Sequence, residues 1–180
     1  MQPVLWFCMN LARPIRFSPY YQSRVWGGRR LETVLSRSLP DASTPFGESW
    51  EVSDRAEAMS TTADGVTLND LWQKHRAEVF GGLKSDSPCF PLLMKILDAC
   101  DDLSIQVHPP ASRAVELGGD PKTEMWFIAH ADPGAKIYAG LKNGVTRAQF
   151  DAALQNGTLE EVVHVLEPVT GACLFIPSGR

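Results

Sequence analysis

The stretch L-S-I-Q-V-H-P-P, residues 103–110, is the most informative segment of this 180-residue chain. In a β-strand, successive side chains point to opposite faces. Read in this way, the stretch places its three apolar residues on one face and Ser104, Gln106 and His108 on the other. This pattern predicts a strand with one face in a hydrophobic core and the other lining a polar site.

A second segment, K-T-E-M-W-F-I at 122–128, brings in Glu124 sixteen residues after His108. The amide oxygen of Gln106, an imidazole nitrogen and a carboxylate oxygen together suit a borderline divalent metal such as zinc. The alternative is a solvated sheet face for Gln106 and His108, and a surface charge for Glu124. No tight spacing rule connects these three residues, so both interpretations remain open.

The composition is that of an ordinary globular protein, with 44% hydrophobic and 21% charged residues and a net charge of −4. The length predicts one domain, and the absence of basic runs argues against nucleic acid or a membrane surface as partners. Ordered patterning begins near Arg13, so we expect an N-terminal extension at 1–13 and a single domain at 14–180. The four cysteines, which lie in apolar stretches without a C-x-x-C pair, predict reduced core residues and a cytoplasmic location: Cys8, Cys89, Cys100 and Cys173.

Predicted strands outnumber predicted helices around the polar residues. We expect further strands at 48–53, 124–129, 135–139 and 171–176, with a hairpin turn at 132–134, and helices at 67–80, 111–117, 146–155 and 158–166. This order favours a mainly β fold, an antiparallel sandwich or barrel with short helices inserted between strands.

Lys95 interrupts the apolar run L-L-M-K-I-L at 92–97. An unpaired ammonium in a core is costly, so Lys95 either reaches a polar cavity or protects an edge strand from aggregation, and the pattern does not choose between the two. Trp26, by residue type alone, is more often a core aromatic than a substrate platform.

Seven segments, taken together and in this order, resemble the type I phosphomannose isomerase family. They are R-V-W-G-G (24–28), G-E-S-W-E-V-S (47–53), P-L-L-M-K-I-L-D-A (91–99), L-S-I-Q-V-H-P (103–109), K-T-E-M-W-F-I (122–128), I-Y-A-G-L (137–141) and F-I-P-S-G (175–179). Each segment alone is unremarkable, but the ordered set is highly specific. The resemblance runs from about residue 14 to the last residue.

The resemblance implies a cupin-type jelly-roll core, a zinc ion, and reversible interconversion of mannose 6-phosphate and fructose 6-phosphate. It implies that Gln106, His108 and Glu124 are three of four zinc ligands. It also assigns four residues to the pocket for the phosphorylated hexose: Trp26, Lys95, Ser104 and Lys122. Lys122 and Ser104 would hold the phosphate. The reaction would move a proton between C1 and C2 through an ene-diol, and no residue is assigned as the catalytic base.

One departure from the family pattern concerns the end of the sequence. In the family, a histidine that supplies the fourth ligand follows F-I-P-S-G, and an arginine thought to act in catalysis comes later. The sequence ends at Arg180, so it resembles an N-terminal portion, and we expect little or no isomerase activity from these 180 residues alone. The alternative is a non-catalytic cupin that binds sugar phosphates. A metal-cupin oxygenase would require more histidine ligands than one.

Overall fold

The structure is a computed structural model that describes residues 13–179; Cys8 and nearly all of the expected extension at 1–13 lie outside the described residues. The chain divides into two compact units, which meet in sequence between Leu103 and Ser104. Unit 1 is the part up to residue 103 and unit 2 the part from residue 104. Each unit is described by itself.

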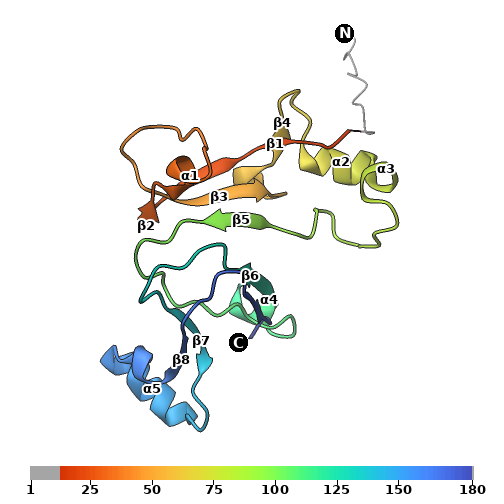
Figure 1. The fold of residues 1–180 in the computed structure, drawn as a ribbon. Helices are drawn as coiled ribbons and strands as arrows, with labels where there is room; N and C mark the ends of the chain where they lie inside the picture. The colour runs from red at the N-terminus through yellow and green to blue at the C-terminus, as the bar shows by residue number, and fades with distance from the viewer. Residues whose placement is uncertain (1–12, 180) are drawn as a thin grey trace. The chain divides into compact units, whose positions relative to one another are not determined.

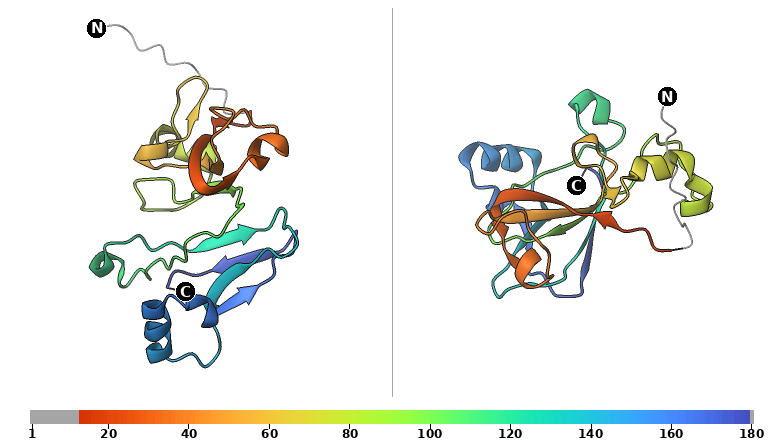
Figure 2. Two further views of the ribbon diagram at one scale, coloured as in Figure 1. Left: turned by 90° about the vertical axis from the view of Figure 1, so that its left-hand side faces the viewer. Right: turned by 90° about the horizontal axis from the view of Figure 1, so that it is seen from above.

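Unit 1 contains a three-stranded antiparallel sheet in the order β2-β3-β5, and a short β1-β4 pair (Figure 1). Figure 2 shows the same sheet from two further directions. Its elements are β1 (Phe17–Ser18), β2 (Tyr20–Gly28), α1 (Arg30–Thr33), β3 (Phe46–Val52), the 3₁₀ turn η1 (Ala56–Ala58), β4 (Thr61–Thr62), α2 (Leu68–Lys74), α3 (Arg76–Phe80) and β5 (Met94–Leu97). The strand predicted at 48–53 is confirmed as β3.

The helix predicted at 67–80 is confirmed in position but is made of two short helices that meet at His75. The Thr67 side chain caps α2 by accepting a hydrogen bond of 3.0 Å from the backbone N–H of Asp70. Trp72 of α2 is fully buried, and its ring lies 5.2 Å from Phe80 and 5.4 Å from Phe90. This aromatic cluster is the hydrophobic centre of the helical part of unit 1.

The strands β2 and β3 approach each other closely where the segments R-V-W-G-G and G-E-S-W-E-V-S meet. A Cβ added to Gly27 would lie 2.4 Å from the backbone nitrogen of Gly47, and one added to Gly47 would lie 2.5 Å from the Trp26 ring. A Cβ on Gly28 would lie 2.8 Å from a carboxylate oxygen of Asp98. None of the three glycines has a positive φ. Glycine is therefore needed at these positions for close packing and not for an unusual backbone conformation.

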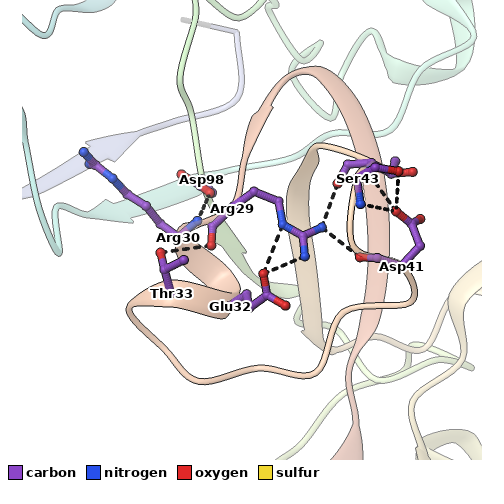
Figure 3. A network of polar contacts seen from close by, with 8 residues as sticks. Arg29, Arg30, Glu32, Thr33, Asp41, Ser43 and Asp98 are labelled. Atoms are coloured by element: carbon purple, nitrogen blue, oxygen red, sulfur yellow. Dashed lines mark hydrogen bonds and ion pairs between the residues drawn. The ribbon is translucent and has the colours of Figure 1, made fainter.

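A polar network fixes α1 and the loop that follows it (Figure 3). Asp98, at the end of β5, accepts a 2.7 Å hydrogen bond from the backbone N–H of Arg30 at the start of α1. Arg29 binds Glu32 at 2.6 Å and also donates to the carbonyl oxygens of Asp41 and Thr44, at 2.9 and 3.0 Å. These contacts join the returning loop to the R-V-W-G-G segment.

Unit 2 contains two antiparallel ribbons, β6-β9 and β7-β8, with α5 next to β8 (Figure 1). Its elements are α4 (Ala114–Leu117), β6 (Glu124–Phe127), β7 (Ile137–Leu141), α5 (Arg147–Asn156), the 3₁₀ turn η2 (Leu159–Glu161), β8 (Val163–Leu166) and β9 (Cys173–Ile176). The mainly β, antiparallel fold class with inserted short helices is confirmed. Within residues 13–179, no helix combines the length and apolar character that crossing a bilayer requires.

The strand predicted at 103–108 is wrong. In the part of the chain that the structure describes, this segment is extended but pairs with no strand, and Ile105 and Val107 are 47% and 63% exposed rather than buried. Alternation of apolar and polar residues identifies the two faces of a strand, but a strand also needs a neighbour that supplies hydrogen bonds. Pro109 and Pro110 shorten the usable segment further, because neither carries an N–H.

Two other local predictions are wrong. The strands β6 and β7 do not form a hairpin: Glu124 of β6 is paired with Ile176 of β9, and β7 pairs with β8. The turn itself forms, with Ala135 N–H donating to Asp132 at 3.1 Å. The segment 158–166 is one 3₁₀ turn followed by β8, because its β-branched valines favour a strand over a helix.

The cysteines were predicted to be core residues, and this is wrong for the three that the structure describes. Cys89, Cys100 and Cys173 are exposed, and none of them forms a disulfide with another described residue. Cys89 lies in the irregular segment before β5, and Cys173 begins β9, where alternate side chains are exposed. Apolar neighbours in sequence therefore did not imply burial.

The close approach of β2 and β3 gives a prediction about stability. Gly27→Ala should lower the free energy of unfolding by about 2 kcal/mol or more, because the new methyl group meets backbone atoms that cannot rotate away. Gly82→Ala is the matched control, since a Cβ there meets nothing within 4 Å and Gly82 has no positive φ. Urea unfolding measures both variants. Equal stability of the two would contradict the packing described here.

Candidate functional site

A buried carboxylate, Glu48, organises the polar face of the β2-β3-β5 sheet. The side chain is on the central strand β3, and the residue is 7% exposed. Its Oε2 atom accepts a hydrogen bond of 2.7 Å from Trp50 Nε1, and forms ion pairs with Arg24 at 3.2 Å and Lys95 at 3.4 Å. All three strands of the sheet therefore contribute a donor to one oxygen.

The environment of Glu48 lowers the pKa of its carboxyl group. Burial by itself would raise this pKa, but the hydrogen bond from Trp50 and the positive charges of Lys95 and Arg24 outweigh that effect. Glu48 is thus held as a carboxylate between two neighbouring cations.

Lys95 lies on an edge strand, which is one of the two positions that the sequence left open. It belongs to β5, the edge strand of its sheet, and lies opposite Trp50 in the β3–β5 register. Its ammonium lies 4.1 Å above the centre of the Trp50 ring and its side chain keeps 23% exposure. Lys95 is therefore paired at the sheet surface and stays partly exposed. Trp26 is half-buried and packs over Gly47.

In unit 2, Ser104 and Gln106 interact directly. The amide nitrogen of Gln106 donates a 2.9 Å hydrogen bond to Ser104 Oγ. With the amide in this orientation, the Gln106 carbonyl oxygen is not used in that bond and can act as an acceptor or a metal ligand. Both residues are exposed.

Gln106 and His108 line the same open depression of about 570 Å³ in unit 2. The depression is also lined by six residues around the two prolines and the end of α4, and by Gly179 from the last segment: Val107, Pro109, Pro110, Leu117, Gly119, Asp120 and Gly179. The backbone N–H of Gly179 donates to the His108 carbonyl at 2.7 Å, which ties the F-I-P-S-G segment to L-S-I-Q-V-H-P.

Lys122 and Glu124 form a pair at the start of β6. Their charged groups lie 3.1 Å apart, and their side chains are 31% and 29% exposed. Ser178, two residues after the end of β9, donates its backbone N–H to Thr123 Oγ1 at 3.2 Å. The side chains of Lys122 and Glu124 are thus brought together at the junction of β6 with the last segment.

The sequence-predicted residues lie in separate local contacts. Gln106 bonds Ser104 and lines a depression with His108, and Lys122 pairs with Glu124. Lys95 contacts Trp50, and Trp26 packs over Gly47. Among residues 13–179, no three His, Cys, Asp or Glu side chains are grouped closely enough to hold a metal ion. The role of Glu48 was missed by sequence reasoning. A usable signal existed, because Glu48 and Trp50 share a strand face and the charge of Glu48 sits in a buried strand.

Comparison with known proteins gives a family match. The model of the phosphomannose isomerase type I catalytic domain matches residues 15–121. The chain belongs to the type I phosphomannose isomerase family. That match includes the three-stranded sheet with Glu48 and Lys95, and the segment that carries Gln106 and His108.

The relatives are named as isomerases and are about twice as long. The chain is 34% identical over 174 residues to mannose-6-phosphate isomerase of Streptococcus mutans, and 35% identical over 172 residues to mannose-6-phosphate isomerase ManA of Bacillus subtilis. These alignments cover 94% and 92% of the chain, but 53% and 52% of the relatives. The crystal structure of mannose 6-phosphate isomerase from Bacillus subtilis matches 92% of the chain and 53% of that protein, with 33% identity and a TM-score of 0.81.

The partly exposed Lys122–Glu124 pair gives a prediction that separates a structural role from a ligand-binding role. Pairs this exposed contribute about 0.2–1 kcal/mol to stability, so Lys122→Met and Glu124→Gln should each lower the free energy of unfolding by less than about 1 kcal/mol. Urea unfolding measures the change. A loss of more than about 2 kcal/mol would mean that the pair mainly holds the fold.

Proposed function

We propose that this chain forms part of a zinc-dependent isomerase that interconverts mannose 6-phosphate and fructose 6-phosphate, with residues 14–180 belonging to its catalytic domain. Membership in the type I phosphomannose isomerase family supports this proposal most directly. The chain spans about half the length of the relatives that carry the isomerase name, so we propose their activity for this chain and do not state it as a finding.

The proposed zinc ligands are Gln106, His108 and Glu124. Their chemistry fits zinc: one imidazole nitrogen and two oxygens, with the Gln106 oxygen left available by the hydrogen bond of its nitrogen to Ser104. Glu124 is fixed by Lys122, which orients the carboxylate. Zinc, when bound, supplies a Lewis acid that stabilises negative charge on the oxygens of the sugar.

The proposed substrate-binding residues are Trp26 and Lys95 in unit 1 and Ser104 and Lys122 in unit 2. Lys122 presents an ammonium and Ser104 a hydroxyl, the two types of donor that suit phosphate oxygens. Lys95, paired with Glu48 but partly exposed, supplies a second positive charge. The proton that moves between C1 and C2 of the sugar requires a base, and no residue of the chain is assigned to that role.

A second candidate function is binding of sugar phosphates without turnover. Its support is that the Ser104 hydroxyl and the Lys122 ammonium suit a phosphate group whether or not turnover follows. Under this candidate, Ser104 and the lysines bind the ligand and no isomerisation follows. We also propose a cytoplasmic location for either function, supported by the exposed thiols of Cys89 and Cys173, which form no disulfide within residues 13–179.

Zinc binding can be measured without an activity assay. The chain loaded with zinc and freed of excess metal should hold it, and His108→Ala should lose most of it by elemental analysis, because the imidazole nitrogen is a strong ligand. Zinc binding should also weaken at acid pH, since the imidazole must be neutral to bind metal. His130→Ala is the matched control, because His130 is exposed and paired with Asp132. Unchanged zinc content in His108→Ala would remove His108 from the ligand set.

Substrate binding and turnover are tested separately. Calorimetric titration with mannose 6-phosphate should show binding that Lys122→Met weakens about tenfold or more, because a charge-assisted hydrogen bond is lost. Exposed Lys136→Met should bind as the unchanged chain does.

A coupled assay for fructose 6-phosphate then separates the two candidate functions, with the Bacillus subtilis isomerase as the positive control. Turnover, even far below that of the control, supports the isomerase, whereas binding without turnover in a chain that also holds no zinc supports the second candidate. The absence of any binding would contradict both.

A further inference from the structure

We propose that Glu48 is a positioning residue that fixes the Lys95 ammonium for contact with the phosphorylated sugar. This inference rests on the proposed function, in which Lys95 binds substrate. It adds Glu48, whose buried carboxylate does not touch the ligand and instead holds the Lys95 ammonium that does.

The strand register brings the three side chains together. Glu48 and Trp50 are two residues apart on β3 and share a face, and Lys95 is the direct partner of Trp50 on β5. Lys95 Nζ therefore lies 3.4 Å from Glu48 Oε2 and 4.1 Å from the centre of the Trp50 ring. A carboxylate on one side and an aromatic face on the other restrict a side chain that is otherwise flexible.

Glu48 is also held in place by partners other than Lys95. Its Oε2 atom accepts the 2.7 Å hydrogen bond from Trp50 Nε1 and pairs with Arg24 at 3.2 Å, and the residue is buried. The lowered pKa of Glu48 agrees with a carboxylate that stays charged in this position. Lys95 is therefore the more exposed member of a rigid pair.

The charge of the cluster favours a ligand role over a purely structural one. A pair that served stability alone would need one cation, and a buried ion pair is often no more stabilising than apolar residues of similar size. Here Arg24 and Lys95 both contact one carboxylate, at 3.2 and 3.4 Å, and both side chains stay partly exposed. A phosphorylated sugar carries the complementary negative charge and hydroxyl acceptors.

The test measures the chemical reactivity of Lys95 directly. The complete chain is acetylated with N-hydroxysuccinimidyl acetate, and the rate at Lys95 is followed by mass spectrometry with exposed Lys136 as the internal reference. Glu48→Gln should speed acetylation of Lys95 about tenfold, because the opposite charge that stabilises the unreactive ammonium is lost. Mannose 6-phosphate should slow acetylation of Lys95 in the unchanged chain, and Glu48→Gln should require about tenfold more sugar phosphate for the same protection.

Two further variants separate positioning from general loosening of the sheet. Arg24→Gln removes a different partner from the same carboxylate and should not speed acetylation of Lys95. Glu48→Asp keeps the charge on a shorter side chain and should give an intermediate rate, and it decides the matter if Glu48→Gln does not fold. Equal Lys95 rates in the unchanged chain and the folded Glu48 variants, or equal acceleration in the Glu48 and Arg24 variants, would overturn the inference.

Failure of the inference and failure of the proposed function give different results. If calorimetry detects binding of mannose 6-phosphate but the sugar never protects Lys95, Glu48 has only a structural role and the inference is overturned, while the proposed function loses only Lys95. If calorimetry detects no binding, the proposed function fails and the inference fails with it.

Discussion

The buried carboxylate of Glu48 is the constraint on which the sheet of unit 1 depends. A carboxylate removed from water is costly unless each charge is compensated, and removal of one partner from such a group typically costs about 3–5 kcal/mol. Trp50, Arg24 and Lys95 supply that compensation from all three strands. The close packing of Gly27 against Gly47 brings β2 near enough to β3 for Arg24 to take part. Segments that are far apart in the sequence are thereby joined at one atom.

Local features of the sequence predicted much of unit 1. The Thr67 cap, the helical spacing that follows it and the alternation in β3 depend on neighbouring residues, so the sequence alone located them. The position of Lys95 in an apolar run also indicated a special environment. The identity of its partner could not be predicted, because Glu48 is 47 residues away and only the strand register brings the two together.

Predictions in unit 2 failed where they depended on strand partners. Residues 103–108 have the alternation of a strand, yet the described residues provide no neighbour for them, and β6 pairs with β9 rather than with the next strand along the chain. The family resemblance, in contrast, was carried by whole segments and is confirmed by the match over 15–121. It identified candidate ligands and substrate contacts that no single spacing rule would select. Glu48 was missed because two of its partners, Arg24 and Lys95, are far from it in the sequence.

A measurement of the pKa of the Glu48 carboxyl group tests the central role of this residue most directly. The carboxyl ¹³C signal of Glu48 can be followed by NMR during an acid titration of the folded chain. The account predicts a midpoint below the ordinary glutamate value of about 4.3, and an upward shift of that midpoint in Arg24→Gln. Because the pKa is lowered by folding, Glu48 stabilises the fold above its unfolded pKa, and this contribution is lost as the pH falls through the folded pKa. A midpoint at or above the ordinary value would contradict the central role of this carboxylate, since burial would then outweigh its three partners.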